Sequence, residues 1–140
     1  LQKELPSGVL SVEHSFQPWS GFRRLFEDTR LGGDSEDATF TSPKLCYDPC
    51  NFWLSGDGDF LKEITDALAT DWLSMVHLKQ RVGGSISTRL EAGDVDWQQQ
   101  LTALRRAKYA GPFLFETAPS ANMWECLADS RQCLAELIGQ

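Results

Sequence analysis

The sequence predicts an α/β fold in which parallel strands alternate with helices. Short apolar runs recur along the 140 residues, and segments with apolar residues at the three-to-four spacing of a helix separate them. Strands and helices that alternate in this way imply parallel pairing through right-handed crossovers. The runs are almost continuously apolar, which is typical of strands covered by helices on both faces.

The expected elements follow one another in a regular order. The predicted strands cover residues 8–13, 44–48, 72–77 and 112–116. The predicted helices cover about residues 18–30, 59–69, a segment that starts near residue 96, and 122–138. Residues 32–43 and the segment after residue 77 are polar and contain paired glycines, which predicts loops.

The last two helices carry the most specific signals. Asp96 precedes Gln99 by three residues, a pattern that predicts an N-cap. The buried face of that helix is expected to consist of Trp97, Leu101 and Leu104. For the final helix we expect four buried apolar residues, namely Met123, Leu127, Leu134 and Leu137.

Composition excludes several classes of protein. The formal net charge of -7 argues against a nucleic-acid partner, which requires clustered Lys and Arg. The sequence has no apolar run long enough for a membrane span and no signal-peptide pattern, so we expect no membrane association and a cytoplasmic location. Its four cysteines are too few for a disulfide scaffold.

The cysteines are interpreted in two pairs. Cys126 and Cys133 share one face of the final predicted helix, and we interpret them as small buried apolar residues. Cys46 and Cys50 flank Asp48, but neither a second cysteine pair nor a histidine pair lies close by. We therefore do not expect zinc binding by this pair alone.

An ionisable side chain stands at the end of each predicted strand. These residues are Glu13, Asp48, His77 and Glu116. In parallel α/β folds, ligands bind at the carboxyl ends of the strands, so the four side chains are expected to converge. Three converging carboxylates would repel one another unless a cation is present. The set suits Mn²⁺ or Mg²⁺, with Co²⁺ or Zn²⁺ as alternatives.

These motifs resemble those of the xylose isomerase-like (β/α)₈ barrel superfamily, which includes sugar phosphate isomerases and epimerases. The resemblance rests on Leu45–Asn51, on His77-Leu78-Lys79, on Gly93–Trp97, and on Leu104–Pro112 followed by a strand that ends at Glu116. Ser11–His14 resembles the fifth-strand motif. The resemblance spans nearly the whole chain, and its order matches strands five to eight. It implies that residues 1–140 form a partial barrel domain, the C-terminal half.

The resemblance also implies a chemistry. Glu13, Asp48, His77 and Glu116 would bind a divalent metal, and Glu13 and Glu116 would move protons. The reaction would be isomerisation or epimerisation of a sugar or sugar phosphate through a metal-stabilised enediolate. The expected substrate-binding residues are Asn51, Lys79, Arg81, Arg89 and Trp53. Asn51 stands where several family members have His.

Several alternatives stay open at this stage. Phe52 and Trp53 fit either a pocket wall or a core, whereas His14 is expected to point away from the metal because strand residues alternate. Inosose or dehydroshikimate dehydration would use the same metal chemistry, and an abasic-site endonuclease is a weaker alternative. A half-barrel could also bind metal without turnover. It would have two open sheet edges, so it would need the missing N-terminal half or a second copy.

Overall fold

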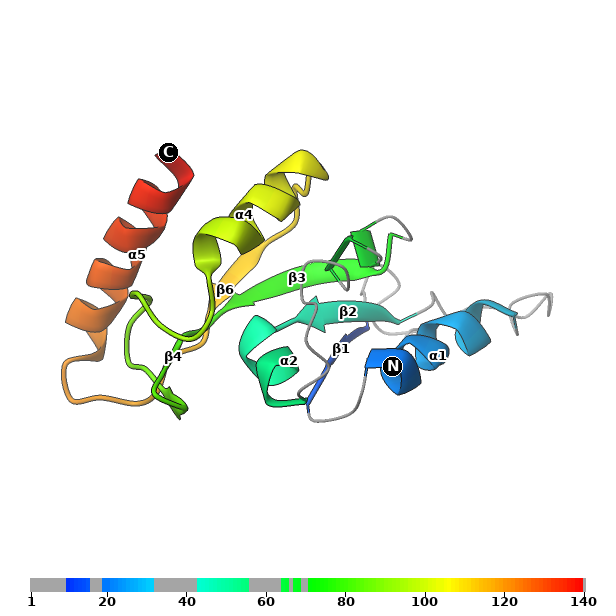
Figure 1. The fold of residues 1–140 in the computed structure, drawn as a ribbon, viewed down its shortest axis with the longest axis horizontal. Coiled ribbons are helices and arrows are strands. Elements are labelled where there is room, and N and C mark those ends of the chain that lie inside the picture. The colour runs from blue at the N-terminus through cyan, green and yellow to red at the C-terminus, as the bar shows by residue number, and fades with distance from the viewer. Residues whose placement is uncertain are drawn as a thin grey trace, which may run out of the picture.

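The computed structural model describes residues 10–15, 19–31, 43–55, 64–65, 67–68 and 71–139, without the side chains of 29–31 and 53–55. Within these residues, four strands form one parallel sheet in the order β1-β2-β3-β6 (Figure 1). The strands are β1 (Ser11–Glu13), β2 (Lys44–Tyr47), β3 (Leu73–Leu78) and β6 (Phe113–Phe115). The predicted α/β fold with parallel strands is confirmed.

The helices mostly match the prediction. They are α1 (Trp19–Leu31), α2 (Pro49–Ser55), α4 (Trp97–Arg106) and α5 (Met123–Gly139). The Asp96 side chain caps α4 by accepting a hydrogen bond from the Gln99 backbone N–H at 3.0 Å, as expected. Of the predicted helix at 59–69, residues 64–65 and 67–68 are helical and the others lie outside the described residues.

Helix α2 was not predicted. Its sequence signal is the pair Asp48-Pro49, because Pro is favoured at the first helical position and Asp is a strong N-cap. Asp48 Oδ1 accepts hydrogen bonds from the backbone N–H groups of Cys50 at 2.8 Å and Asn51 at 3.3 Å. This cap starts the helix directly after the strand, so Phe52 turns into the core and is only 1% exposed. The pocket-wall interpretation of Phe52 is therefore wrong.

The core lies between the sheet and the helices that cover it. Its cluster combines residues of α1, β2, α2, β3 and α4, including the expected Trp97, Leu101 and Leu104. Aromatic rings join the layers, since Phe26 of α1 stacks on Trp72 at 5.4 Å between centroids. Burial of such side chains supplies most of the stabilising free energy of a domain of this size.

The buried face of α5 differs from the prediction. Met123 is 41% exposed, and Leu127 is only partly buried, whereas Cys126 and Ser130 are the buried residues of the helix. Leu134 and Leu137 pack partly buried against the core. Helix α5 packs against α4 and against the loop around Leu90, and its buried residues lie on that side. Cys126 is buried, as expected, and Cys133 is partly exposed.

The two outer strands of the sheet have exposed apolar residues. Leu10 precedes β1 and is 58% exposed, and Leu114 of β6 is 52% exposed. The neighbouring Phe113 is also exposed. Unpaired strand edges of this kind favour association with further strands. None of the helices in the described part of the chain is long and apolar enough to cross a membrane.

A short hairpin follows β3 where only a polar loop was expected. Strands β4 (Arg81–Val82) and β5 (Ser85–Ile86) pair antiparallel through Gly83 and Gly84, both with positive φ, which is the requirement of a type I′ turn. The buried Gln80 side chain holds the segment in place. Its Nε2 donates to the carbonyls of Glu91 and Val95, and its Oε1 accepts from the Arg81 and Val95 N–H groups.

Gly93 is essential to this packing, which gives a testable prediction. A Cβ at this position would overlap the Arg81 carbonyl oxygen and lie 2.7 Å from Gln80 Cδ. We expect Gly93→Ala to lower the free energy of unfolding by about 1–3 kcal/mol. The control is Gly21→Ala, since a Cβ there meets nothing within 4 Å and Ala favours the helix by about 0.5–1 kcal/mol. Urea unfolding measures both; equal effects would contradict the packing argument.

Candidate metal centre

The four ionisable residues predicted at strand ends lie together in the structure. Glu13 is the last residue of β1, His77 the penultimate residue of β3, and Asp48 and Glu116 directly follow β2 and β6. Parallel pairing places these carboxyl ends at one edge of the sheet. One ligand atom from each residue lies within 4.8 Å of the others. A group of donors this close together could hold a metal ion.

The closest contacts join the histidine and a buried lysine to the carboxylates. His77 Nδ1 lies 2.8 Å from Glu116 Oε2 and 3.5 Å from Glu13 Oε1. Lys79 Nζ lies 2.6 Å from Asp48 Oδ2 and 2.9 Å from Glu116 Oε1. The Asp48 and Lys79 side chains are 0% and 8% exposed, so their charges compensate each other away from water. The centre therefore has a buried floor and a more open rim.

Three of the candidate ligand atoms lack a well-directed hydrogen bond. Asp48 Oδ2, His77 Nδ1 and Glu116 Oε2 are buried and have close neighbours, but none of these lies in a hydrogen-bonding direction. Buried polar atoms normally have such a partner. Three carboxylates and an imidazole in this state are the donors that hard or borderline divalent ions prefer. The residues present thus fit a divalent metal ion.

Asp48 is positioned by the helix that it caps. Its Oδ1 is held by the backbone N–H groups of Cys50 and Asn51, which leaves Oδ2 directed at the site. Metal-ligating carboxylates commonly have their second oxygen fixed by hydrogen bonds of this kind. The local sequence Asp-Pro-Cys-Asn therefore does two things, because it starts α2 and orients the ligand.

Asn51 positions Glu13. Its Nδ2 donates to Glu13 Oε1 at 2.8 Å and to the His14 carbonyl oxygen at 3.0 Å. Direct contact between Asn51 and a substrate stays a prediction. The His14 ring points away from the four residues of the candidate metal site (the metal group), as strand alternation predicts. It stacks on Phe52 at 4.0 Å between centroids.

The surroundings of Glu13 shift its pKa away from that of an ordinary surface carboxyl. Burial raises the pKa of Glu13, and the negative charges of Glu116 and Asp48 raise it further, although His77 opposes them. Burial alone would lower the pKa of Lys79, but its contacts with Asp48 and Glu116 raise it overall. Lys79 therefore stays protonated between the two carboxylates.

The other predicted substrate-binding residues lie in different segments of the fold. Arg81 belongs to the hairpin, where its Nη2 donates to the Gly84 carbonyl. Arg89 pairs with Asp129 of α5 at 2.9 Å. Trp53 lies in α2, and its side chain is outside the described residues. Lys79 directly follows β3 and lies between Asp48 and Glu116. Substrate binding by these four residues stays a prediction.

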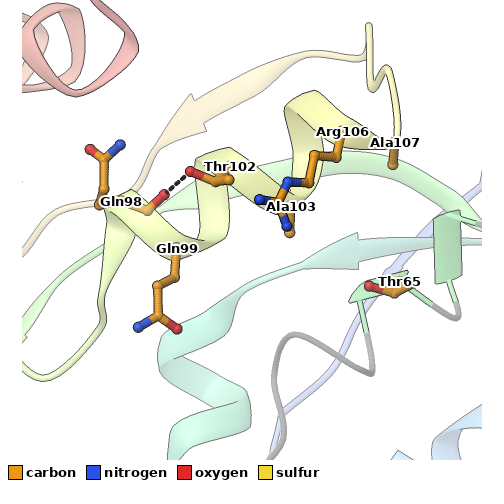
Figure 2. A pocket seen from close by; sticks show the side chains of 7 residues that line it. All are labelled: Thr65, Gln98, Gln99, Thr102, Ala103, Arg106 and Ala107. Carbon is orange, nitrogen blue, oxygen red and sulfur yellow. Dashed lines mark hydrogen bonds between the residues drawn. The ribbon is translucent and has the colours of Figure 1, made fainter. Parts of the chain in front are cut away.

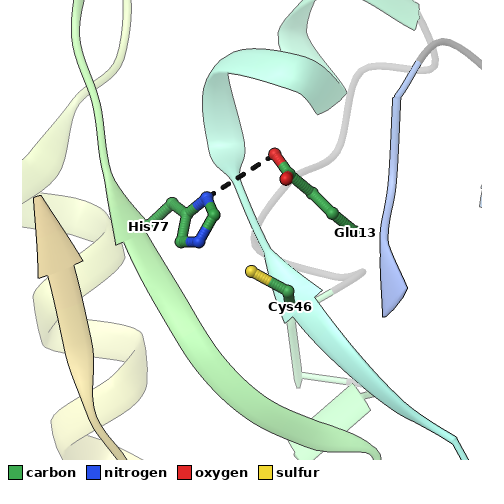
Figure 3. Close-up of side chains that lie close together, drawn as sticks. All are labelled: Glu13, Cys46 and His77. Atoms are coloured by element: carbon green, nitrogen blue, oxygen red, sulfur yellow. Dashed lines mark ion pairs between the residues drawn. The ribbon is translucent and has the colours of Figure 1, made fainter. Parts of the chain in front are cut away.

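The sequence interpretation considered Cys46 only as a pair with Cys50 and did not place it at the centre. Cys46 lies in β2, two residues before Asp48. Because side chains alternate along a strand, both point to the same face of the sheet. The thiol, a Glu13 oxygen and a His77 nitrogen lie within 4.8 Å of one another (Figure 3). The period-two pattern of the strand contained this information, but only the pairing of β1, β2 and β3 brings the three groups together.

A separate groove lies outside the centre. It is lined by Thr65, Ala107 and residues of α4 that include Gln98, Thr102 and Arg106 (Figure 2). Thr102 Oγ1 donates a hydrogen bond to the Gln98 carbonyl within the helix. The groove shares no residue with the metal group.

Comparison with known proteins identifies the family. The model of the xylose isomerase-like TIM barrel family matches residues 41–137, and the chain belongs to this family. A comparison with curated proteins gives no significant match. The fold and the strand-end site agree with this assignment, since TIM barrels carry their sites at the carboxyl ends of the strands.

Solved structures show the same fold at low sequence identity. The match to an L-ribulose 3-epimerase has a TM-score of 0.71 and 16% identity, and covers 94% of this chain and 47% of that one. The match to a xylose isomerase domain protein from Planctomyces limnophilus has a TM-score of 0.68 and 19% identity, and covers 94% of this chain and 46% of that one. The match to a 3-keto-D-glucoside 4-epimerase from E. coli has a TM-score of 0.67 and 16% identity, and covers 99% of this chain and 51% of that one. The chain spans about half the length of these proteins.

The buried ion pairs of Lys79 give a prediction that needs no substrate. We expect Lys79→Met to lower the free energy of unfolding by about 3–5 kcal/mol, because Asp48 would be left buried without its counter-charge. Mn²⁺ should then raise the melting temperature of the variant more than that of the wild type. The exposed pair between Lys44 and Asp71 supplies the control, and Lys44→Met should cost about 1 kcal/mol or less. Equal losses would contradict the counter-charge role.

Proposed function

We propose that this chain carries the metal-binding half of a sugar or sugar-phosphate isomerase or epimerase. The supporting observation is the convergence of Glu13, Asp48, His77 and Glu116, with one ligand atom from each within 4.8 Å of the others. Two of the similar structures are described as sugar epimerases, and a third as a xylose isomerase domain protein. The proposed substrate is therefore a small keto-sugar, free or phosphorylated.

The proposed cofactor is one divalent ion. The oxygen-rich donor set favours Mn²⁺ or Mg²⁺, and Co²⁺ or Zn²⁺ would also fit. When bound, the ion would polarise the substrate carbonyl and stabilise the negative charge that develops on neighbouring oxygens during proton removal. Asp48 and His77, the deeper pair, would mainly hold it.

Glu13 and Glu116 are the proposed proton carriers. They are the two most exposed members of the group, at 38% and 45%, so a substrate entering from the open side reaches them first. They extend from β1 and β6, the two outer strands of the sheet, and so flank His77. Glu13 suits the role of base, because its raised pKa makes its carboxylate a stronger proton acceptor. Glu116 would return a proton on the opposite side of the substrate.

The remaining residues are proposed to bind substrate. Asn51 would orient Glu13 and contact a hydroxyl group, and Lys79 would be available to an anionic group once a metal ion replaced its charge. Arg81 and Arg89 both follow β3 and are candidates for a phosphate contact. Trp53 would contribute an apolar wall.

One alternative has an observation in its favour. The chain spans about half the length of its structural relatives, and the outer strand β6 exposes Phe113 and Leu114. A half-barrel of this kind would bind the metal, and turnover would require four further β/α units from an N-terminal half or a second copy. Mn²⁺ binding without reaction distinguishes this alternative from the proposed enzyme.

Solvent exchange tests the proton carriers. With saturating Mn²⁺ in D₂O, the wild type is expected to incorporate deuterium at the carbon next to the carbonyl of a ketose such as L-ribulose. Glu13→Gln should slow incorporation by about 10²–10⁴-fold, because the acceptor is lost. Proton NMR follows the reaction. Glu27→Gln, on the exposed surface of α1, is the control. Unchanged exchange in Glu13→Gln would contradict the assignment, and a wild type that binds Mn²⁺ without exchange supports the half-barrel alternative.

Metal affinity tests the positioning of Glu13 by Asn51. We expect Asn51→Ala to weaken Mn²⁺ binding by about 10–100-fold, the usual effect of removing a group that orients a ligand. Isothermal titration calorimetry measures it. Asn122→Ala is the matched control, since the Asn122 side chain contacts Glu125 on an exposed part of α5. An affinity equal to that of the control would show that Glu13 needs no such support.

A further inference from the structure

Cys46 lies beside the proposed metal group without belonging to it. It is the third residue of β2, its backbone partner in the parallel register is Glu13, and it is only 3% exposed. Figure 3 shows its thiol facing the space between Glu13 and His77. The sulfur, a Glu13 oxygen and a His77 nitrogen all lie within 4.8 Å of one another.

These three groups have the chemistry of a zinc-type site. In tetrahedral zinc sites the ion binds sulfur at about 2.3 Å and nitrogen or oxygen at about 2.0–2.2 Å, so donor atoms stand roughly 3.5 Å apart. The present separations are no more than 4.8 Å, so small side-chain movements would bring the donors to that spacing. One thiolate, one imidazole and one carboxylate leave a fourth position open, as in catalytic zinc sites.

Metal binding by this set would leave the ion pairs of Lys79 in place. Lys79 Nζ already compensates Asp48 and Glu116, at 2.6 and 2.9 Å. A Glu13 carboxylate, a Cys46 thiolate and a neutral His77 together carry two negative charges, which match one divalent ion. The ion can therefore bind without separating Lys79 from its partners. Binding by all four strand-end residues would instead require Asp48 and Glu116 to turn from the lysine to the metal.

We propose that Glu13, Cys46 and His77 form a second, sulfur-containing donor set that binds a thiophilic divalent ion such as Zn²⁺. Soft thiolate ligands select Zn²⁺ over Mg²⁺ and Mn²⁺. On binding, the thiol releases its proton to water and the sulfur becomes a ligand. The chain would thus bind Mn²⁺ through its oxygen-rich set and Zn²⁺ or Co²⁺ through Cys46. This inference rests on metal binding at the proposed centre and not on turnover.

Cobalt spectroscopy tests the sulfur ligand directly. Titrating the reduced wild-type chain with Co²⁺ is expected to produce a near-ultraviolet sulfur-to-cobalt charge-transfer band. Cys46→Ser should abolish the band and weaken Zn²⁺ binding by at least about tenfold, with Mn²⁺ affinity nearly unchanged. Cys50→Ser is the matched control and should keep the band, since Cys50 is also buried beside Asp48 but belongs to the hydrophobic core.

A measurement on the wild type protects the test against a variant that fails to fold. X-ray absorption of the Zn²⁺-bound chain should show one sulfur neighbour at about 2.3 Å. A first shell of only nitrogen and oxygen, or a cobalt band unchanged by Cys46→Ser, would overturn the inference. If Mn²⁺ binds but the sulfur signal is absent, this inference alone fails. If neither Mn²⁺ nor Co²⁺ binds, the proposed function fails with it.

Discussion

The ends of parallel strands bring three carboxylates to one edge of the sheet, and their mutual repulsion must be balanced by positive charge. In this chain Lys79 supplies part of that charge, because its buried side chain places the ammonium group between Asp48 and Glu116. The other features of the centre depend on this balance. His77 stands between the two more exposed glutamates, and the cap of α2 directs Asp48 toward the lysine.

The fold supports the centre from several directions at once. Asn51, in the first turn of α2, reaches back to Glu13 on β1, so one helix orients two of the four proposed ligands. Gln80 follows β3 in the chain, and its side chain fixes the path of the hairpin and of the loop that leads to α4. The hydrogen bonds of Gln80 are buried or partly buried, whereas the bond from Asn51 to Glu13 is exposed to solvent. Such support is what a metal site requires of its surroundings.

The proposed reaction depends on the rest of a barrel around the centre. Glu13 and Glu116 extend from β1 and β6, which are the outer strands of the described sheet and have exposed apolar neighbours. The two proposed proton carriers therefore stand where the rest of a barrel would enclose a substrate. If the proposed function is right, metal binding and turnover would be separable, because the proposed donors lie in this chain and the enclosure of a substrate would need further β/α units. The proposed sulfur ligand, Cys46, would add a choice between hard and thiophilic ions.

Much of this protein follows from its sequence. Alternating apolar runs and helical spacing determine the parallel α/β fold, and an ionisable residue after each run predicts that Glu13, Asp48, His77 and Glu116 meet. Asp48-Pro49 would also have revealed α2, because both residues are specific helix starters. Only the tertiary structure decided the neighbours of each side chain. It placed Lys79 among the carboxylates, turned Phe52 into the core and brought Cys46 beside Glu13 and His77. The physical reason is that local pattern sets which face a residue occupies, whereas contacts across strands depend on register and packing, which no local window contains.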